Sequence, residues 1–220
     1  VLGTDKFGRD LLSRLIIGSR VSISIGFVAV IISLILGIFF GSIAGFYEGW
    51  IDKIIIWLIN VVWSVPTLLM VIAITLALGK GFWQVFVAVG ITMWVEVARL
   101  VRGLVKSIKE EYYVKAGVVL GFSRMRILLY HILPMTIGPL IIISAANFAS
   151  AILMESGLGF LGIGAQPPMP SWGGMVKNHF NYLLLGKPYL TILPGLAIMS
   201  LVLSFMTLGN SLRDALDVKS

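Results

Sequence analysis

Cysteine is absent from this 220-residue sequence, and histidine occurs only twice, at His131 and His179. The first absence excludes disulfide bonds and thiolate metal sites, and two distant histidines argue against a histidine-rich metal site. Charge is also scarce, because 12% of the residues are charged, compared with roughly 25% in a soluble domain. Hydrophobic residues make up 58% of the chain. We therefore predict an integral membrane protein.

Sequence motifs of the common hydrolases are missing as well. The Gly79-Lys80-Gly81 segment lacks the spacing of a phosphate-binding loop, and neither a Gly-x-Ser-x-Gly nor a His-Glu-x-x-His pattern occurs. We therefore expect that this chain does not hydrolyse nucleotides. The net charge of +7 reflects the membrane topology rather than binding to nucleic acid.

Long runs with little or no charge predict an all-α fold, a polytopic membrane helix bundle with five transmembrane helices. A helix of about 20 apolar residues is long enough to cross the hydrocarbon core. The predicted transmembrane domain covers residues 21–212, and its spans are 21–47, 54–79, 82–107, 127–154 and 189–212.

Three segments complete the predicted organisation. Residues 1–20 carry apolar side chains on one helical face and an Asp10–Arg14 pair on another, which favours a short interfacial helix over a disordered lead-in. Residues 156–188 are rich in glycine and proline and predict an ordered, partly re-entrant loop. Residues 213–220 form a polar tail.

Small and polar residues inside the spans indicate packing and pathway positions. Gly37, Gly41 and Gly45 recur every four residues, so they share one helix face and allow a neighbouring helix to approach closely. Prolines and polar groups within a span often line an interior, although a simple packing kink is an equal alternative. The pathway candidates are Ser64, Pro66, Asn147 and Glu155.

Ionisable residues stand near the end of the third predicted span. Glu96, Arg99 and Arg102 follow one another at helical spacing, and such groups within a span are functional candidates. Because they precede a polar stretch, we favour the interpretation that they reach outward to the interface and that Glu96 pairs with Arg99.

The most polar stretch runs from Ser107 to Pro134, between apolar segments. Ser107 and Glu110 match a capping box, Gly121 is a helix stop, and Ser123 can cap the next helix. Gly117 costs roughly 1 kcal/mol inside a helix, which close approach of another backbone would justify. We interpret the stretch as a short helix held outside the bilayer for a soluble partner. An ordinary basic loop with one helical turn is the alternative.

The distribution of lysine and arginine favours one orientation. Five spans place the two ends of the chain on opposite sides of the membrane. Basic residues are more numerous on the side that holds residues 107–126 and the tail, so we predict that this side is cytoplasmic. The basic segment 1–20 does not fit this bias.

The polar stretch also resembles a family motif. Residues 115–134 are similar to the Glu-Ala-Ala-x3-Gly-x9-Ile-x-Leu-Pro motif of binding-protein-dependent ABC importer permeases. The matching residues are Ala116, Gly121, Leu133 and Pro134, and the departures are Lys115 for the glutamate, Gly117 for the second alanine and His131 for the isoleucine.

Two further stretches are more specific. Gly3-Thr4-Asp5 with Gly8-Arg9-Asp10, and the Gln166-Pro167-Pro168-x-Pro170-Ser171-Trp172-Gly173 stretch, look like the C-type subunit of the dipeptide, oligopeptide and nickel permease group. The resemblance covers nearly the whole chain. Such permeases have one more span before the Gly-Thr-Asp segment, which implies that a span precedes this sequence.

The resemblance implies a permease subunit of an ATP-driven importer of peptides or nickel in a bacterial or archaeal cytoplasmic membrane. A coupling helix at about 108–121 would dock on an ATP-binding subunit, which would bind ATP and Mg in place of this chain. A second permease, an extracytoplasmic solute-binding protein at loop 156–188, and lipid are the other implied partners. The implied docking residues are Glu110, Glu111, Tyr112, Lys115, Ala116, Gly117 and Gly121.

Two other functions compete with this interpretation. A self-sufficient channel or secondary carrier would need intramembrane ionic groups and an internal repeat, and neither is clear in the sequence. An intramembrane hydrolase would have to use His131 or Glu155, and no residue spacing supports it.

Overall fold

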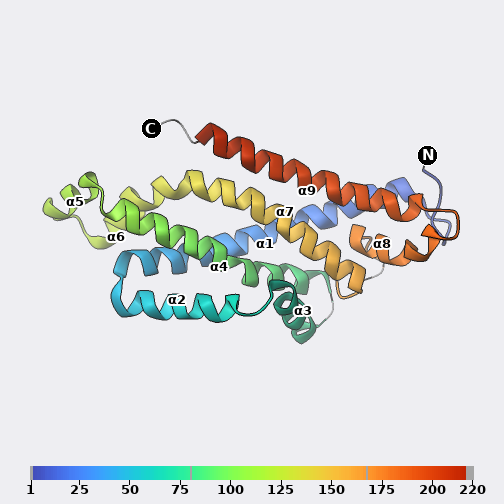
Figure 1. Cartoon of the computed structure of the whole chain (residues 1–220), viewed down its shortest axis with the longest axis horizontal. Helices are drawn as coiled ribbons and strands as arrows, with labels where there is room; N and C mark the ends of the chain where they lie inside the picture. The colour runs from blue at the N-terminus through green and yellow to red at the C-terminus, as the bar shows by residue number, and fades with distance from the viewer. Residues whose placement is uncertain (1, 80, 167, 217–220) are drawn as a thin grey trace.

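The computed structural model describes residues 2–79, 81–166 and 168–216. Within these residues every regular element is a helix, and one isolated bridge joins Thr4 to Asp10. Four helices are long and apolar enough to cross a membrane, and a bent pair would make a fifth span. The predicted all-α membrane bundle is therefore confirmed. Figure 1 shows an elongated bundle with α5 at one end and α8 at the other.

The first long helix, α1 (Leu11–Tyr47), is continuous. The separate interfacial helix predicted for residues 1–20 is therefore wrong. The Asp10 carboxylate caps α1 by accepting from the Ser13 backbone N–H at 2.8 Å, and Leu11 is fully buried. No proline follows to break the helix, so residues 11–20 extend the span.

Asp5 organises the turn before α1. Its carboxylate accepts from the backbone N–H groups of Phe7 (2.8 Å) and Arg9 (2.9 Å) and from Arg9 Nε (2.7 Å). Burial opposes ionisation of this carboxyl, but these hydrogen bonds outweigh it and lower the pKa of Asp5. Arg14 Nε lies 3.7 Å from the same carboxylate, so the predicted Asp10–Arg14 pair is wrong.

The bundle is built around the contact between α1 and α4 (Phe82–Lys109). Gly37, Gly41 and Gly45 all face α4. A Cβ added at Gly41 would lie 2.9 Å from Val101 Cβ, and one at Gly45 would lie 2.8 Å from the Arg102 carbonyl oxygen. The absence of side chains at these positions thus allows the two helices to pack backbone to side chain.

The second predicted span, residues 54–79, is broken in the structure. It consists of α2 (Gly49–Trp63) and α3 (Thr67–Leu78), which meet at 88°. Pro66 has an extended backbone and no N–H to donate, so α2 cannot continue through it. In Figure 1 the two helices lie along one side of the bundle.

The fourth span is longer and less regular than predicted. It runs from Arg124 to Leu161. It comprises α6 (Arg124–Arg126), a π-helical turn (Ile127–Ile132), a 3-10 turn (Leu133–Thr136) and α7 (Ile137–Leu161). The irregular turns surround Pro134, which breaks regular hydrogen bonding. Glu155 lies inside α7 and does not end the span, so that part of the prediction is wrong.

The predicted loop 156–188 therefore begins only after α7. It contains α8 (Trp172–His179) and a 3-10 turn (Phe180–Leu183). Trp172 Nε1 donates to the Leu15 carbonyl oxygen of α1 at 2.9 Å, and the Ser171 side chain caps α8. The described part of this loop is ordered, because α8 packs against α7 and α9.

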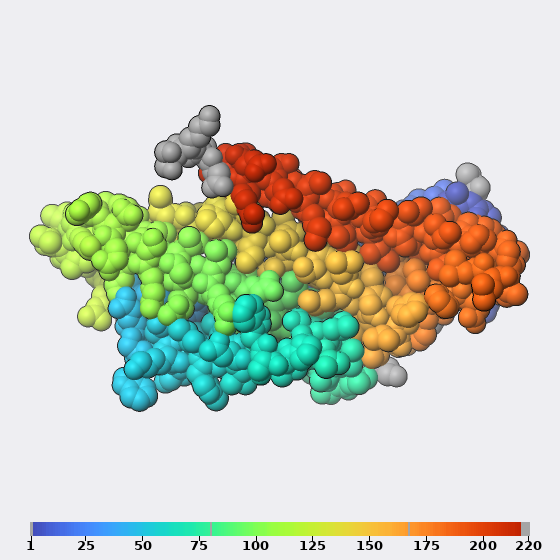
Figure 2. Space-filling view, in the orientation of Figure 1, coloured from blue at the N-terminus to red at the C-terminus, as the bar shows by residue number. Residues whose placement is uncertain are grey.

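The last helix, α9 (Tyr189–Leu216), extends past the predicted end at residue 212. Residues 213–216 of the predicted polar tail are therefore helical, and residues 217–220 lie outside the described residues. The Phe205 ring of α9 stacks on Phe148 of α7, with 3.9 Å between the ring centroids. Figure 2 shows α9 lying along the surface of the bundle.

Candidate functional site

The end of the molecule that holds α5 (Tyr112–Val119) carries the residues proposed for docking. The helix is shorter than the predicted 108–121, because α4 continues through Lys109. The predicted capping box is wrong. Glu110 ends α4, where its backbone N–H donates to the Ser107 carbonyl oxygen at 3.1 Å, and no side-chain hydrogen bond caps α5.

The far side of α5 is exposed and partly apolar. Tyr112 is 89% exposed and Val119 is 87% exposed, and Leu120 follows at 72%. Of the proposed docking residues, six are exposed, namely Glu110, Glu111, Tyr112, Lys115, Ala116 and Gly121. Val118, Val119 and Leu120 were not among them, although three consecutive apolar residues in a polar stretch are the signal that could have found them.

Two glycines shape this end of the chain. Gly117 is buried, and a Cβ there would meet the Phe122 ring at 3.2 Å, so the close neighbour is a ring of the same chain rather than another backbone. Gly121 adopts φ +80°, the left-handed conformation that ends helices. The Ser123 hydroxyl then accepts from the Arg126 backbone N–H at 3.3 Å, as predicted.

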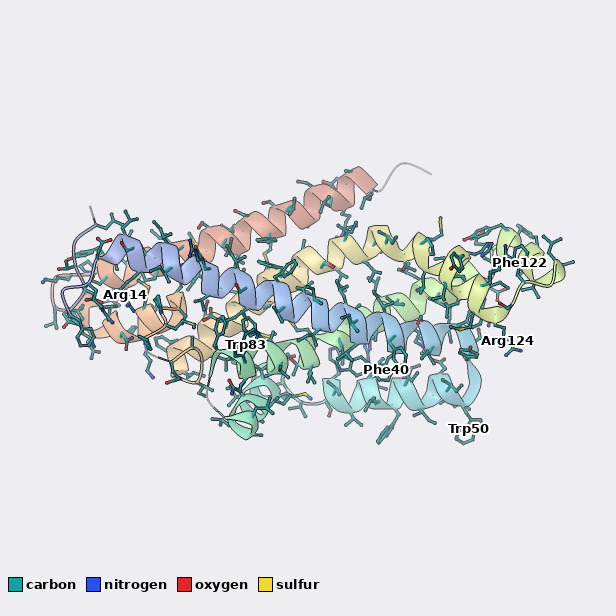
Figure 3. All side chains as sticks on the ribbon, turned by 180° about the vertical axis from the view of Figure 1, so that it is seen from behind. Arg14, Phe40, Trp50, Trp83, Phe122 and Arg124 are labelled. Carbon is teal, nitrogen blue, oxygen red and sulfur yellow. The ribbon has the colours of Figure 1, made fainter. Side chains whose placement is uncertain are left out.

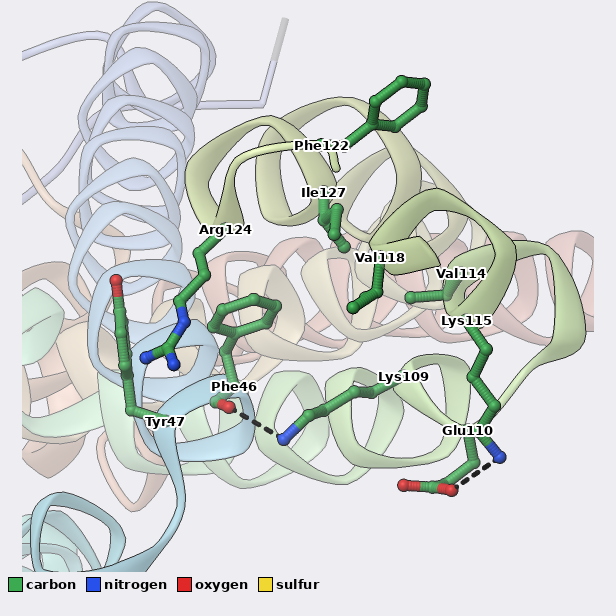
Figure 4. A pocket seen from close by; sticks show the side chains of 10 residues that line it. All are labelled: Phe46, Tyr47, Lys109, Glu110, Val114, Lys115, Val118, Phe122, Arg124 and Ile127. Carbon is green, nitrogen blue, oxygen red and sulfur yellow. Dashed lines mark hydrogen bonds and ion pairs between the residues drawn. The ribbon is translucent and has the colours of Figure 1, made fainter. Parts of the chain in front are cut away.

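A cavity of about 400 Å³ lies between α5 and the ends of α1 and α4. In Figure 4, Val114, Val118 and Ile127 form its apolar side, and Arg124 points toward Phe46 and Tyr47. Beside the cavity, the buried Val114 joins α5 to an apolar cluster of the bundle.

Two lysine side chains that line this cavity make polar contacts within the chain. Lys109 Nζ donates to the Phe46 carbonyl oxygen at 3.0 Å, and Lys115 Nζ lies 2.9 Å from Glu110 Oε2. The hydrogen bond and charge of the Lys115 ammonium lower the pKa of the exposed Glu110 carboxyl. Lys115 thus pairs within its own chain in this structure.

An ionic cluster near α5 was not predicted. Asp52 of α2 is buried and accepts from Arg102 at 2.8 Å and from Lys106 at 2.9 Å, both on α4. Next to it, Lys109 lies 3.2 Å from Glu48. The sequence carries no local signal for this cluster, because the partners of Glu48 and Asp52 are about 50 to 60 residues away.

The predicted Glu96–Arg99 pair is also wrong. Arg99 instead donates to Asn60 Oδ1 of α2 at 2.7 Å, and its guanidinium lies 3.6 Å from the centroid of the Trp63 ring. Arg99 therefore contacts α2 rather than Glu96. Glu96 is exposed and has no ion pair within the described residues.

The four pathway candidates fall into two groups. Ser64 and Pro66 are exposed at the break between α2 and α3. Asn147 is 2% exposed and Glu155 is fully buried, where Glu155 accepts from the Ser22 hydroxyl of α1 at 3.1 Å. Of the four candidates, therefore, only Ser64 and Pro66 lie on one exposed surface, and Asn147 and Glu155 are buried.

Comparison with known proteins decides the family. Residues 37–219 match the model of the binding-protein-dependent transport system inner membrane component. This chain belongs to that family. The predicted membership is thereby confirmed, and the chain is a multi-pass, non-catalytic permease component of the inner membrane.

The sequences of curated relatives align with almost the whole of this permease. It is 41% identical to the dipeptide transport system permease protein DppC of Alkalihalophilus pseudofirmus, over 99% of this chain and 71% of the relative. It is 38% identical to the glutathione transport system permease protein GsiD of Pectobacterium atrosepticum, over 99% and 72%. The oligopeptide transport system permease protein OppC of Bacillus subtilis is also 38% identical, over 99% and 71%.

Solved structures share the fold of the permease. A chain of the inward-facing methionine ABC transporter MetNI matches with a TM-score of 0.67 and 15% identity, covering 92% of this chain and 96% of that chain. A chain of an amino acid ABC transporter solved with histidines matches with a TM-score of 0.63 and 18% identity, covering 91% and 96%. At these identities the likeness shows the ABC importer permease fold alone.

Family membership decides between the competing functions. A binding-protein-dependent ABC importer works with an ATPase and a solute-binding protein, so this permease has both as partners. The alternatives of a self-sufficient channel or carrier and of an intramembrane hydrolase are therefore abandoned.

Proposed function

We propose that this permease forms half of the membrane pathway of an importer for peptides. The observation that carries the proposal is its 38–41% identity, over 99% of the chain, to permeases of dipeptide, oligopeptide and glutathione systems. We propose peptide rather than nickel, since those three names all describe peptide solutes. A second permease chain would complete the pathway.

The α5 end is proposed to receive the ATPase. An exposed apolar patch outside the spans is unfavourable in water unless a partner covers it, and Tyr112, Val119 and Leu120 form such a patch. The exposed docking residues named above surround it, while the buried Gly117 supports it from within by admitting the Phe122 ring. The partner would bind ATP and Mg, because the sequence holds no phosphate-binding loop of its own.

Rigid helices would carry the movement of α5 into the membrane. Only two residues, Glu110 and Glu111, separate α5 from the end of α4, and the Tyr113 hydroxyl donates to the His131 carbonyl oxygen at 3.4 Å. A displacement of α5 therefore reaches α4 directly and the fourth span through His131. Closure of the ATPases would rock both spans between inward- and outward-facing states.

The opposite end is proposed to face the solute-binding protein. The Asp5 turn, α8 and the start of α9 meet there, and Figure 3 shows Arg14 at the end of the molecule farthest from Phe122 and Arg124. The exposed apolar side chains along α9 would then face lipid.

Reconstitution tests the proposed function. Proteoliposomes that hold this permease with its partner permease, its ATPases and its binding protein should take up a radiolabelled dipeptide when ATP is supplied. Vesicles with this chain alone, or without ATP, should take up none. Uptake at full rate by this chain alone would overturn the proposal, and so would an active transporter that carries nickel but no peptide.

A further inference from the structure

A polar surface lies midway along α4, away from the α5 end. Arg99 reaches Asn60 of α2 and covers the face of Trp63, and Glu96 stands one turn earlier with its side chain exposed. Glu96 is 14 residues from the start of α4 and 13 from its end. At 1.5 Å per residue each end is about 20 Å away, so Glu96 lies well inside a helix that is long and apolar enough to cross a membrane.

Contact between this surface and lipid is therefore unfavourable. A carboxylate in the middle of a span costs several kcal/mol against hydrocarbon, unless it faces water or a partner in the bundle. The broken span points the same way. The break at Ser64–Pro66 leaves irregular backbone at mid-span, which is tolerated where it is buried in protein or lines a water-filled cavity.

The same surface contains a small hollow. A cavity of about 50 Å³ lies between the α2–α3 break, α4 and α7. Glu96 lines it, whereas Arg99 does not, so the positive charge is held against α2 and the negative charge faces the hollow. The rest of the lining is mixed, with hydroxyl, thioether and apolar side chains, namely Thr67, Thr92, Ser150, Met70, Met93, Met154, Val62 and Trp63.

From this arrangement we propose that the Glu96 surface lines the solute pathway and that the Glu96 carboxylate binds the α-ammonium group of the passing peptide. The inference rests on the proposed function, since a peptide with a free amino terminus carries that cation. A single exposed carboxylate with hydroxyl groups beside it offers an ammonium an ionic partner and further acceptors. The narrow hollow would widen around the solute as the permease alternates between its two states.

The absence of cysteine from this chain allows a direct test. Ser150→Cys is introduced into the complete transporter, whose other subunits have had their cysteines replaced. Its rates of reaction with cationic and anionic methanethiosulfonate reagents of matched size are then compared. We expect the cationic reagent to react at least about tenfold faster, because a nearby carboxylate attracts it, and Glu96→Gln to bring the two rates close together. Leu203→Cys, exposed on α9, is the lipid-facing control and should react slowly with both.

Transport provides the second measurement. Glu96→Gln should lower dipeptide uptake by about tenfold or more, and Glu96→Asp should restore part of it. ATP hydrolysis stimulated by the loaded binding protein should stay within about twofold of wild type, which separates solute recognition from assembly. The control Asp214→Asn removes an acid at the far end of α9 and should not affect uptake.

The outcomes separate the two proposals. Failure of the wild-type transporter to take up any dipeptide would overturn the proposed function. Normal uptake by wild type, together with a Ser150→Cys that no aqueous reagent reaches or a charge preference that Glu96→Gln leaves unchanged, would overturn only the role of Glu96. Loss of assembly or of stimulated ATP hydrolysis in Glu96→Gln would show that Glu96 pairs with the second permease instead.

Discussion

At the scale of single residues, Gly41 of α1 and Gly103 of α4 differ sharply in their surroundings. Gly41 meets the backbone of α4, with a built Cβ 2.9 Å from Val101 Cβ and 3.0 Å from Ala98 Cα. Gly103 of α4 has open space around its Cβ direction. The first glycine is required by packing, and the second is not.

This difference gives a prediction with an internal control. Gly41→Ala should destabilise the permease by roughly 1–3 kcal/mol, because α1 and α4 must move apart. Gly103→Ala should be neutral or stabilise it by up to about 1 kcal/mol, since alanine is the better helix former. The melting temperatures of the two variants in detergent measure both effects. Equal melting temperatures would show that the α1–α4 contact tolerates a methyl group.

The shared helix face of Gly37, Gly41 and Gly45 could be predicted from the sequence, because helical periodicity is local. The ion-pair partner of each charged residue could not be predicted. Arg99 was expected to use Glu96 on its own helix, yet it bonds to Asn60 and covers Trp63 on another. Nothing in the sequence indicates which neighbouring helix will present a better acceptor.

At the scale of elements, α2 is held to α4 by ion pairs at its first turn and by an apolar cluster that contains Ile55 and Ile59. Asp52 accepts from both Arg102 and Lys106, and its side chain is 11% exposed in these pairs. Removal of the carboxylate would leave two cations without their partner at the place where α2 begins. The position of the first turn of α2 therefore depends on Asp52.

Asp52→Asn should accordingly lower the melting temperature of the permease, with a loss of roughly 1–3 kcal/mol in stability. Lys53→Gln also removes a charge from the first turn of α2 but should change little, because Lys53 lies over the Trp50 ring and has no ion pair among the described residues. Protease cleavage between α2 and α3 offers a second measurement, which should rise only in Asp52→Asn. A stable Asp52→Asn with an intact α2 would contradict this account.

Element boundaries were predicted where a run of apolar residues ends in a strong local signal. Gly121 and Ser123 produced the expected helix stop and cap. The prediction of a separate interfacial helix at residues 1–20 was wrong, because the polar side chains there face other parts of the chain while α1 continues. The proline at position 66 indicated an interruption, but the 88° angle depends on how α3 packs against α4.

At the scale of the whole molecule, both ends of the permease carry exposed apolar residues. At the α8 end, Trp172 and Met175 are buried against α1 and α9, but the consecutive residues Leu183, Leu184 and Leu185 are exposed. At the α5 end, three consecutive apolar residues and Tyr112 remain exposed. Long helices connect the two ends (Figure 1), so the proposed movement of α5 would act along the length of the bundle.

Val119→Asp tests whether the α5 patch receives the ATPase. The Val119 side chain is 87% exposed, so an aspartate there leaves the fold and melting temperature of the permease unchanged. A charge in the centre of an apolar interface costs a few kcal/mol, which should lower ATPase association by about tenfold or more and abolish ATP-driven uptake. Leu184→Asp, 94% exposed at the opposite end, is the matched control and should leave ATPase association intact. Co-purification of the ATPase with each variant measures the effect directly. Both substitutions add the same charge to a similarly exposed apolar residue. A loss of ATPase association confined to Val119→Asp can therefore arise only from the surface that α5 presents. Equal retention of the ATPase by both variants would place its docking site elsewhere.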